Sequence, residues 1–175
     1  NEVVIGLNDN PVAAADSAQV GEDGSVNIAV LSNDKDIDSG DSFHLQSATQ
    51  AAQGSTRINA DGTIAYTPGA GFQSLAQGQT GTDTFSYQVV DSYGATSTAT
   101  VTVTVTGAND APVAAADTAR VGEDGTTAIT VLANDRDVDT GDVLTIKSAT
   151  GAAHGSLAVN ADGTIAYTPD ASLQS

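Results

Sequence analysis

The chain has 175 residues with 22 acidic and only 5 basic side chains, and its formal net charge is −17. Binding to nucleic acid or to an anionic membrane surface requires Lys and Arg, so this balance argues against both partners. A cation is the partner that the charge favours, because nearly all the acids are aspartates gathered in clusters.

The chain also contains an internal repeat. Residues 8–16 return as residues 109–117, and the match continues at an offset of 101 residues to the end of the chain. A period near 100 residues is the size of a whole β-sandwich domain. We therefore predict three segments: the end of a preceding repeat and a linker (1–8), a complete repeat (9–107), and a second repeat (108–175) without the last two strands.

The complete repeat opens with the linker Asn-Asp-Asn-Pro and continues as alternating runs separated by turn signals. Val101, Val103 and Val105, for example, alternate with threonines, as in a half-buried strand. Strands are predicted at about 11–20, 25–31, 42–48, 54–59, 63–67, 82–90 and 95–106. About seven short strands per repeat predict an all-β fold of tandem cadherin-like or immunoglobulin-like Greek-key β-sandwiches.

The predicted core and turns follow from composition and spacing. Aromatic residues make up only 4% of the chain, so we expect a core of Val, Ile, Leu and Ala. Asp61-Gly62 and Asp162-Gly163 lie between alternating runs, and we expect hairpin turns there. Asp16 and Asp117 follow an alanine run and are expected to be exposed.

The loop at 33–41 carries the strongest chemical signal. It holds four carboxylates within eight residues, a density that suits the 6–8 oxygen ligands of Ca²⁺. Its glycine spacing and lack of a twelfth-position Glu exclude an EF-hand, and Mg²⁺ prefers fewer carboxylates. A solvated acidic loop without an ion is the alternative. Alternating strand direction favours the metal site, because it brings the linker, this loop and Asp91 to one end of the repeat.

The motifs together resemble a known family. Asn-Asp-Asn-Pro and Asn-Asp-Ala-Pro resemble the inter-domain calcium linker of cadherins. With Val-Leu-x-Asn-Asp-x-Asp, the Asp-Gly-Thr-Ile-x-Tyr-Thr-Pro hairpin and the closing Val-Thr-Val-Thr-Val, the unit resembles bacterial cadherin-like (VCBS-type) repeats of large RTX adhesins and biofilm-associated proteins. The resemblance implies an extracellular stalk on the bacterial cell surface, exported by type I secretion and rigidified by Ca²⁺.

By matching position, the resemblance also implies a set of calcium ligands. In the first repeat they are Asp9, Asp34, Asp36, Asp38, Asp41 and Asp91; at the junction they are Glu22, Asn109, Asp110, Asp135, Asp137, Asp139 and Asp142, with Glu123 on the equivalent face of the second repeat. Two departures matter. The cadherin Leu-Asp-Arg-Glu stretch is absent, so the junction is expected to hold fewer ions, and the second repeat has no counterpart of Asp91.

These observations favour a calcium-rigidified adhesive extender whose partners are neighbouring repeats of the same chain. A calcium-dependent module for extracellular polysaccharide is the alternative, with Tyr93, Phe72 or Tyr66 stacking on sugars; another cell's adhesin is a further possible partner. An enzyme has little support, because neither histidine recurs in the other repeat. We expect residues 109–175 to be strained, completed by another chain or sensitive to proteolysis, and residues 1–7 resemble the tail of a preceding final strand.

Overall fold

The computed structural model describes residues 7–171, so residues 1–6 of the predicted strand tail (1–7) lie outside the described residues. The chain divides into two compact units, unit 1 (residues 1–109) and unit 2 (residues 110–175). Apart from two short 3₁₀ turns, η1 (Val30–Ser32) and η2 (Ala70–Phe72), the described secondary structure consists of strands. No helix in the described part is long and apolar enough to cross a membrane.

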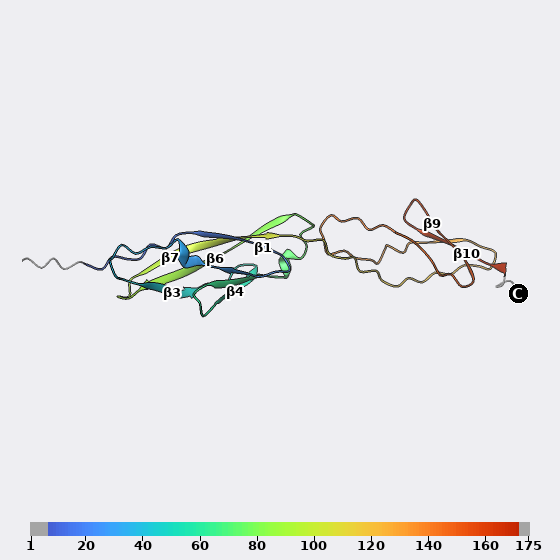
Figure 1. Cartoon of the computed structure of the whole chain (residues 1–175). Helices are drawn as coiled ribbons and strands as arrows, with labels where there is room; N and C mark the ends of the chain where they lie inside the picture. The colour runs from blue at the N-terminus through green and yellow to red at the C-terminus, as the bar shows by residue number, and fades with distance from the viewer. Residues whose placement is uncertain (1–6, 172–175) are drawn as a thin grey trace, which may run out of the picture. The chain divides into compact units, whose positions relative to one another are not determined.

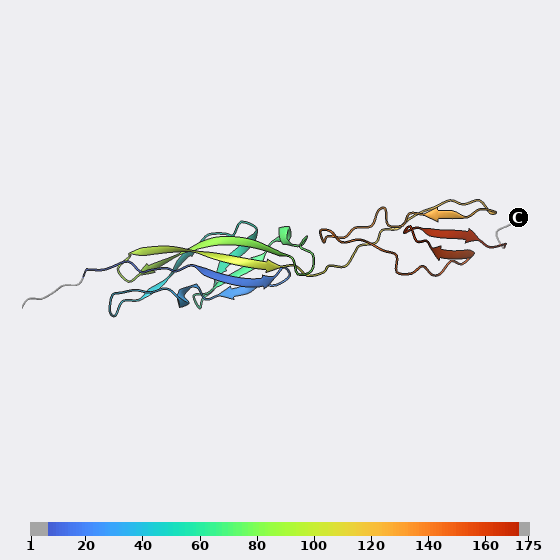
Figure 2. The same ribbon diagram turned by 90° about the horizontal axis from the view of Figure 1, so that it is seen from above.

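The larger sheet of unit 1 has the strand order β1-β7-β6-β3 (Figures 1 and 2). Its strands are β1 (Asp16–Gly21), β7 (Thr96–Thr106), β6 (Thr80–Asp91) and β3 (Phe43–Ala48). β1 pairs with β7 in parallel, whereas β6 pairs antiparallel with both β7 and β3. The chain therefore enters and leaves unit 1 at opposite ends.

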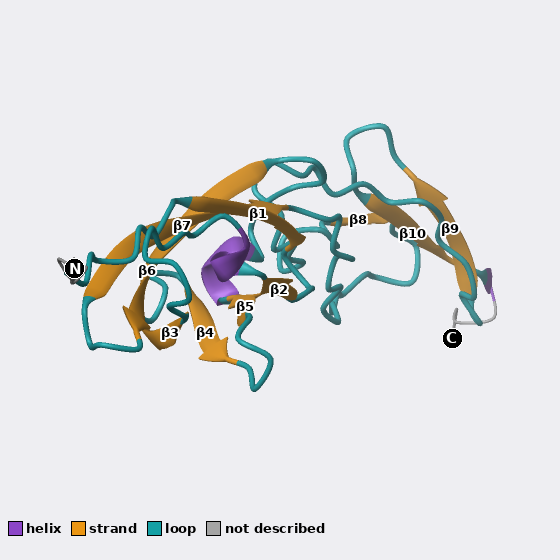
Figure 3. Ribbon diagram, turned by 60° about the vertical axis from the view of Figure 1, so that its left-hand side comes forward, coloured by secondary structure: helices purple, strands orange, loops and turns teal. Residues whose placement is uncertain are grey.

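The smaller sheet of unit 1 has the order β2-β5-β4, with strands Val26–Ile28, Ile64–Pro68 and Gly54–Ile58. All of its pairs are antiparallel. Figure 3 shows β1 and β7 in one layer and β2 and β5 in the other. These seven strands confirm the predicted β-sandwich.

The first strand is shorter than predicted. β1 begins at Asp16 rather than near residue 11, and upstream of it Val12 forms an isolated antiparallel bridge with Lys35. Pro11 has no backbone N–H with which to join a ladder. The segment before β1 is therefore held to the aspartate-rich loop by a backbone bridge, and to the larger sheet through the side chains of Ser97 and Tyr87.

Alternation along the strands builds the core. Val101, Val103 and Val105 of β7 are fully buried, while the threonines between them face outward. The prediction of a purely aliphatic core is wrong for unit 1, since Tyr66, Phe72, Phe85 and Tyr87 are all buried. A low average aromatic content misled the prediction, because only one of the seven aromatic residues, Tyr167, lies in the second repeat.

Unit 2 contains one described sheet with the order β8-β10-β9, formed by Thr127–Ile129, Ile165–Pro169 and Gly155–Val159. It repeats the smaller sheet of unit 1. Residues 117–122 and 144–149, the counterparts of β1 and β3, form no strand there. In unit 1 those two strands pair only with β7 and β6, and residues 110–171 contain no counterpart of either.

Candidate metal centre

Three carboxylates converge at the N-terminal end of unit 1. Asp36 and Asp41 lie on the loop between η1 and β3, and Asp91 ends β6. Each offers an oxygen that lies within 4.8 Å of the other two, and we call these residues the carboxylate trio. Oδ2 of Asp36 and Oδ2 of Asp41 are buried and have no hydrogen-bond partner. The trio thus gathers three carboxylate oxygens in a small volume, and two of its residues have a buried oxygen without a hydrogen-bond donor.

The turn between β6 and β7 holds Asp91 in place. Its Oδ1 accepts hydrogen bonds from the backbone N–H groups of Tyr93 (2.9 Å) and Ala95 (2.8 Å). Its Oδ2 accepts a 2.9 Å hydrogen bond from Nδ2 of Asn8, in the linker. The Asn8 amide, followed by these backbone donors, lowers the pKa of Asp91 below its usual value. The carboxylate is therefore ready to bind a cation without giving up a proton.

Local and long-range hydrogen bonds shape the aspartate-rich loop. Asp36 accepts the backbone N–H of Asp38 at 2.9 Å, and Asp38 in turn accepts the backbone N–H of Asp9 at 2.6 Å. Asp41 accepts the N–H of Ser42 at 2.7 Å and the hydroxyl of Ser92. Gly40 has φ of 90°, a conformation that its missing Cβ allows and that turns the loop back toward Asp91.

The remaining predicted ligands of the first repeat lie outside the trio. Asp34 faces the interior, where its Oδ1 accepts hydrogen bonds from the N–H of Ala14 (2.7 Å) and the hydroxyl of Tyr87 (2.9 Å). Asp9 is exposed and meets the loop through its backbone, and Asp38 connects that backbone to Asp36. The structure thus divides the predicted set into a convergent trio and supporting residues.

Unit 2 has a similar group made of loop residues alone. Oxygens of Asp137, Asp139 and Asp142 lie within 4.8 Å of one another. Asp139 is buried, accepts the N–H of Asp110 at 2.9 Å through Oδ2, and has no hydrogen-bond partner at Oδ1. Asp135 repeats the role of Asp34 by accepting the N–H of Ala115 at 2.8 Å.

Glu22 occupies the C-terminal end of unit 1. It is 3% exposed, and its Oε1 accepts the backbone N–H of Ala108 at 2.7 Å, just before Asn109. Its Oε2 is buried without a hydrogen-bond partner. The counterpart Glu123 is exposed. The predicted sharing of ions by Glu22, Asn109 and the second repeat stays a prediction.

Two acidic residues were missed or misplaced by the sequence reasoning. Asp83 is buried in β6 and accepts four hydrogen bonds, from the N–H groups of Ala52, Gln53 and Thr84 and from the hydroxyl of Tyr66. Asp83 lies two residues before the buried Phe85, and side chains two apart on a strand share a face, so this spacing could have indicated its burial. Asp16, predicted to be exposed, is half-buried with Oδ2 fully enclosed.

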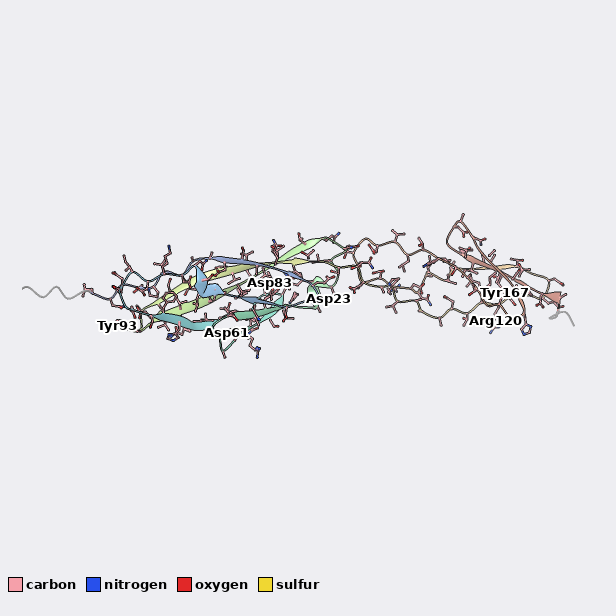
Figure 4. All side chains as sticks on the ribbon, viewed as in Figure 1. Asp23, Asp61, Asp83, Tyr93, Arg120 and Tyr167 are labelled. Atoms are coloured by element: carbon pink, nitrogen blue, oxygen red, sulfur yellow. The ribbon has the colours of Figure 1, made fainter. Side chains whose placement is uncertain are left out.

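The aromatic residues suggested for sugar stacking differ in exposure. Tyr66 and Phe72 are buried in the core, whereas Tyr93 is 78% exposed. Figure 4 shows Tyr93 at the end of unit 1 and Asp83 within its interior. Tyr93 also lines an open cleft together with Asp41 and Ser92, beside the trio.

Comparison with known families decides the identity of the chain. The bacterial cadherin-like domain matches residues 8–107 and again residues 109–175. The chain belongs to the bacterial cadherin-like domain family. Cadherin-like domains are extracellular, adhesion-type or structural repeats without enzymatic activity, and they generally bind calcium. Comparison with curated proteins gives no match.

Solved structures of low similarity cover nearly the whole chain. A cis-dimer structure of protocadherin gammaB7 domains EC3–6 matches 93% of this chain with 18% identity and a TM-score of 0.47. Protocadherin gammaB7 domains 1–4 match with 17% identity and a TM-score of 0.46. An endo-fucoidan hydrolase of glycoside hydrolase family 107 matches with 18% identity and a TM-score of 0.31. This chain spans only 40%, 41% and 24% of those chains.

Proposed function

We propose that this bacterial cadherin-like chain is a calcium-rigidified extender of a secreted surface adhesin that supports cell adhesion or biofilm formation. The proposal includes an RTX-type parent protein exported by type I secretion. It also includes repeat boundaries at residues 9–107 and 108–175, and the two matched stretches, 8–107 and 109–175, support a two-repeat division.

The carboxylate trio carries the proposal. Asp36, Asp41 and Asp91 bring three like charges together, and two of their buried oxygens have no hydrogen-bond partner. Such an arrangement is unfavourable without a counter-charge, because like charges repel strongly where water is excluded. A hard cation with oxygen ligands removes the repulsion and fills the unsatisfied positions, and Ca²⁺ suits a site rich in carboxylates.

The energy of binding is sufficient to change the state of the chain. Extracellular calcium modules bind with Kd on the order of 10⁻⁴–10⁻³ M. At a free concentration about ten times Kd, each ion stabilises the folded state by roughly 1.4 kcal/mol. Domain stability is only about 5–15 kcal/mol, so several ions decide whether a repeat is folded. Low cytosolic calcium would keep the chain loose for export, and external calcium would then stiffen it.

The proposal extends to the junction between repeats. Glu22 has an unsatisfied buried oxygen, and Ala108, to which it is hydrogen-bonded, is followed by Asn109 and Asp110. We include Glu22, Asn109, Asp110, Asp135, Asp137, Asp139 and Asp142 as ligands of junction ions. Binding there would fix the angle between consecutive repeats.

Calorimetry of the whole chain tests the proposal. The melting temperature should rise on replacing EGTA with millimolar Ca²⁺, and Mg²⁺ at the same concentration should raise it less. Asp41→Asn should reduce the rise in melting temperature that Ca²⁺ produces. Asp61→Asn, which changes an exposed acid in a hairpin, should leave that rise unchanged. Equal melting temperatures with and without Ca²⁺ would contradict the proposal.

One observation favours a second function. Tyr93 is exposed beside the trio, so a bound Ca²⁺ and an aromatic ring would face the same cleft. Calcium-dependent binding of extracellular polysaccharide is therefore the alternative. It requires binding on a glycan array that disappears with EGTA and with Tyr93→Ala; binding that survives both changes would argue against this site.

A further inference from the structure

A second group of unsatisfied oxygens lies inside unit 1, apart from the carboxylate trio. Asp34 is only 8% exposed, and its Oδ2 is buried without a hydrogen-bond partner. Oδ2 of Asp16, at the start of β1, is also buried and without a partner. Burial, and next to it the negative charge of Asp34, raise the pKa of Asp16, while Tyr87 and Asn33 act in the opposite direction.

The Tyr87 hydroxyl shows how many oxygens gather at this point. Its oxygen lies 2.9 Å from the carbonyl of Ala14, 3.2 Å from the carbonyl of Val30 and 2.9 Å from Oδ1 of Asp34. A phenol has one hydrogen to donate. Burial and the nearby Asp34 carboxylate raise the pKa of Tyr87, so that hydrogen is retained. Three acceptors therefore compete for one donor.

No basic side chain supplies the missing positive charge. Unit 1 contains only two, Lys35 and Arg57. Lys35 is exposed, and Arg57 donates to Asn59 on the far side of the smaller sheet. Two neighbouring carboxylates whose Oδ2 atoms are both buried without a counter-charge are costly. The group is rich in oxygen and short of positive charge.

We propose that Asp16 and Asp34 bind a calcium ion inside unit 1 through their Oδ2 atoms. The carbonyl oxygens of Ala14 and Val30, which meet the same Tyr87 hydroxyl as Asp34, offer additional ligands, and Ca²⁺ accepts such mixed oxygen sets. This interior site joins the start of β1 to the loop that carries Asp36. It is separate from the carboxylate trio and does not depend on ion binding there.

The second repeat provides an internal comparison. Asp135 accepts a backbone N–H as Asp34 does. Asn134 donates to the carbonyl of Ala116, just before Asp117, as Asn33 donates to the carbonyl of Ala15, just before Asp16. Its Asp117 is exposed, and residues 110–171 contain no counterpart of Tyr87. The aspartate pair is thus enclosed in unit 1, where β6 supplies Tyr87, and not in unit 2. We therefore expect one interior ion in this chain, in unit 1.

Counting bound ions in the whole chain tests the interior site. Native mass spectrometry in Ca²⁺ should show one ion fewer for Asp16→Asn than for the unchanged chain, because Asn keeps the size of Asp16 but loses its charge. Asp41→Asn is the matched variant for the trio and should lose a different ion. The double variant should therefore lose two ions. Failure of the Asp41→Asn arm alone would count against the trio and not against the interior site.

An unchanged ion count in folded Asp16→Asn would overturn the proposal. A second readout covers the case in which Asp16→Asn does not fold. Tb³⁺ bound in place of Ca²⁺ emits when a neighbouring tyrosine is excited, and Tyr87 lies at the interior site. Emission should persist in Tyr93→Phe, which replaces the tyrosine beside the trio with a residue that does not sensitise Tb³⁺, and should fall in Tyr87→Phe. Emission unaffected by Tyr87→Phe would also overturn the proposal.

Discussion

The hydroxyl of Tyr66 donates a 2.9 Å hydrogen bond to Oδ2 of Asp83, and both residues are buried between the two sheets. Asp83 also accepts the backbone N–H groups of Ala52 and Gln53, in the crossing between β3 and β4. One carboxylate thus connects the larger sheet, the smaller sheet and the segment that passes between them.

Tyr66→Phe should destabilise unit 1 by about 1.5–3 kcal/mol, the usual value for a hydrogen bond to a charged group. Hydrogen exchange of the β6 amides, followed by mass spectrometry of the whole chain, measures the loss. Tyr167→Phe (Tyr167 is labelled in Figure 4) is the matched control, because the Tyr167 hydroxyl donates to the carbonyl of His154 in an exposed hydrogen bond. Equal losses of stability in the two variants would show that the hydrogen bond to Asp83 does not cause the effect of Tyr66→Phe.

Gly54→Ala should destabilise β4 by about 1–3 kcal/mol through overpacking. A Cβ at Gly54 would lie 2.6 Å from the ring of Tyr66 and 2.7 Å from the carbonyl oxygen of Thr67. Gly21→Ala is the control, since a Cβ there meets nothing within 4 Å. Urea denaturation should distinguish the two variants, and a neutral Gly54→Ala would mean that the Tyr66 ring and the paired strands β4 and β5 can shift slightly without cost.

Asp41→Asn and Asp91→Ala should respond differently to calcium removal. In EGTA, Asp41→Asn should leave the melting temperature unchanged or raise it, because it relieves repulsion within the trio. Asp91→Ala should lower it in both conditions, since the turn at Tyr93 and Ala95 loses its acceptor. A loss of stability for Asp41→Asn in EGTA would show that Asp41 has a structural role without metal.

The pKa of Asp61 should be lower than normal, chiefly because its carboxylate accepts the Thr63 hydroxyl and then the Thr63 backbone N–H. The folded-state pKa lies below the unfolded value of about 3.9, so this hydrogen bonding stabilises the hairpin above that pH. Stability is lost as the pH falls through the lowered value. Thr63→Val should raise the pKa of Asp61 toward normal.

A ¹³C NMR titration of side-chain carboxyls checks this shift. Asp162, whose pKa is lowered by Thr164 in the same way, serves as a control within the same molecule. Its titration should not change in Thr63→Val. A simultaneous change of both residues would point to a global effect on the chain.

The sequence predicted the fold well where alternation was strong. The Thr-Val run became β7, and strand counting predicted that Asp91 lies at the same end as the loop of Asp36 and Asp41, where the three now meet. The roles of individual aspartates could not be predicted from spacing. Asp34 and Asp36 are two residues apart, yet Asp34 faces Tyr87 and Asp36 faces Asp91, because the bridge between Val12 and Lys35 fixes the loop between them.

Other features depended on contacts distant in sequence. The enclosure of Asp16 depends on Tyr87, 71 positions further along the chain, and no local pattern predicts such a contact. The counterparts of β1 and β3 in the second repeat have the right sequence for strands but no partner strand among residues 110–171. An alternating sequence favours an extended backbone, but a β-strand forms only where a neighbouring strand offers backbone hydrogen bonds.

The parallel pairing of β1 with β7 runs from Asp16 opposite Val101 to Gly21 opposite Thr106. Tension applied along the chain would pull β1 toward one end of unit 1 and β7 toward the other. The hydrogen bonds between them lie across that direction, so they would be loaded in shear and would have to break together rather than one by one. The pairing would make unit 1 resist stretching, a property suited to a tether under flow.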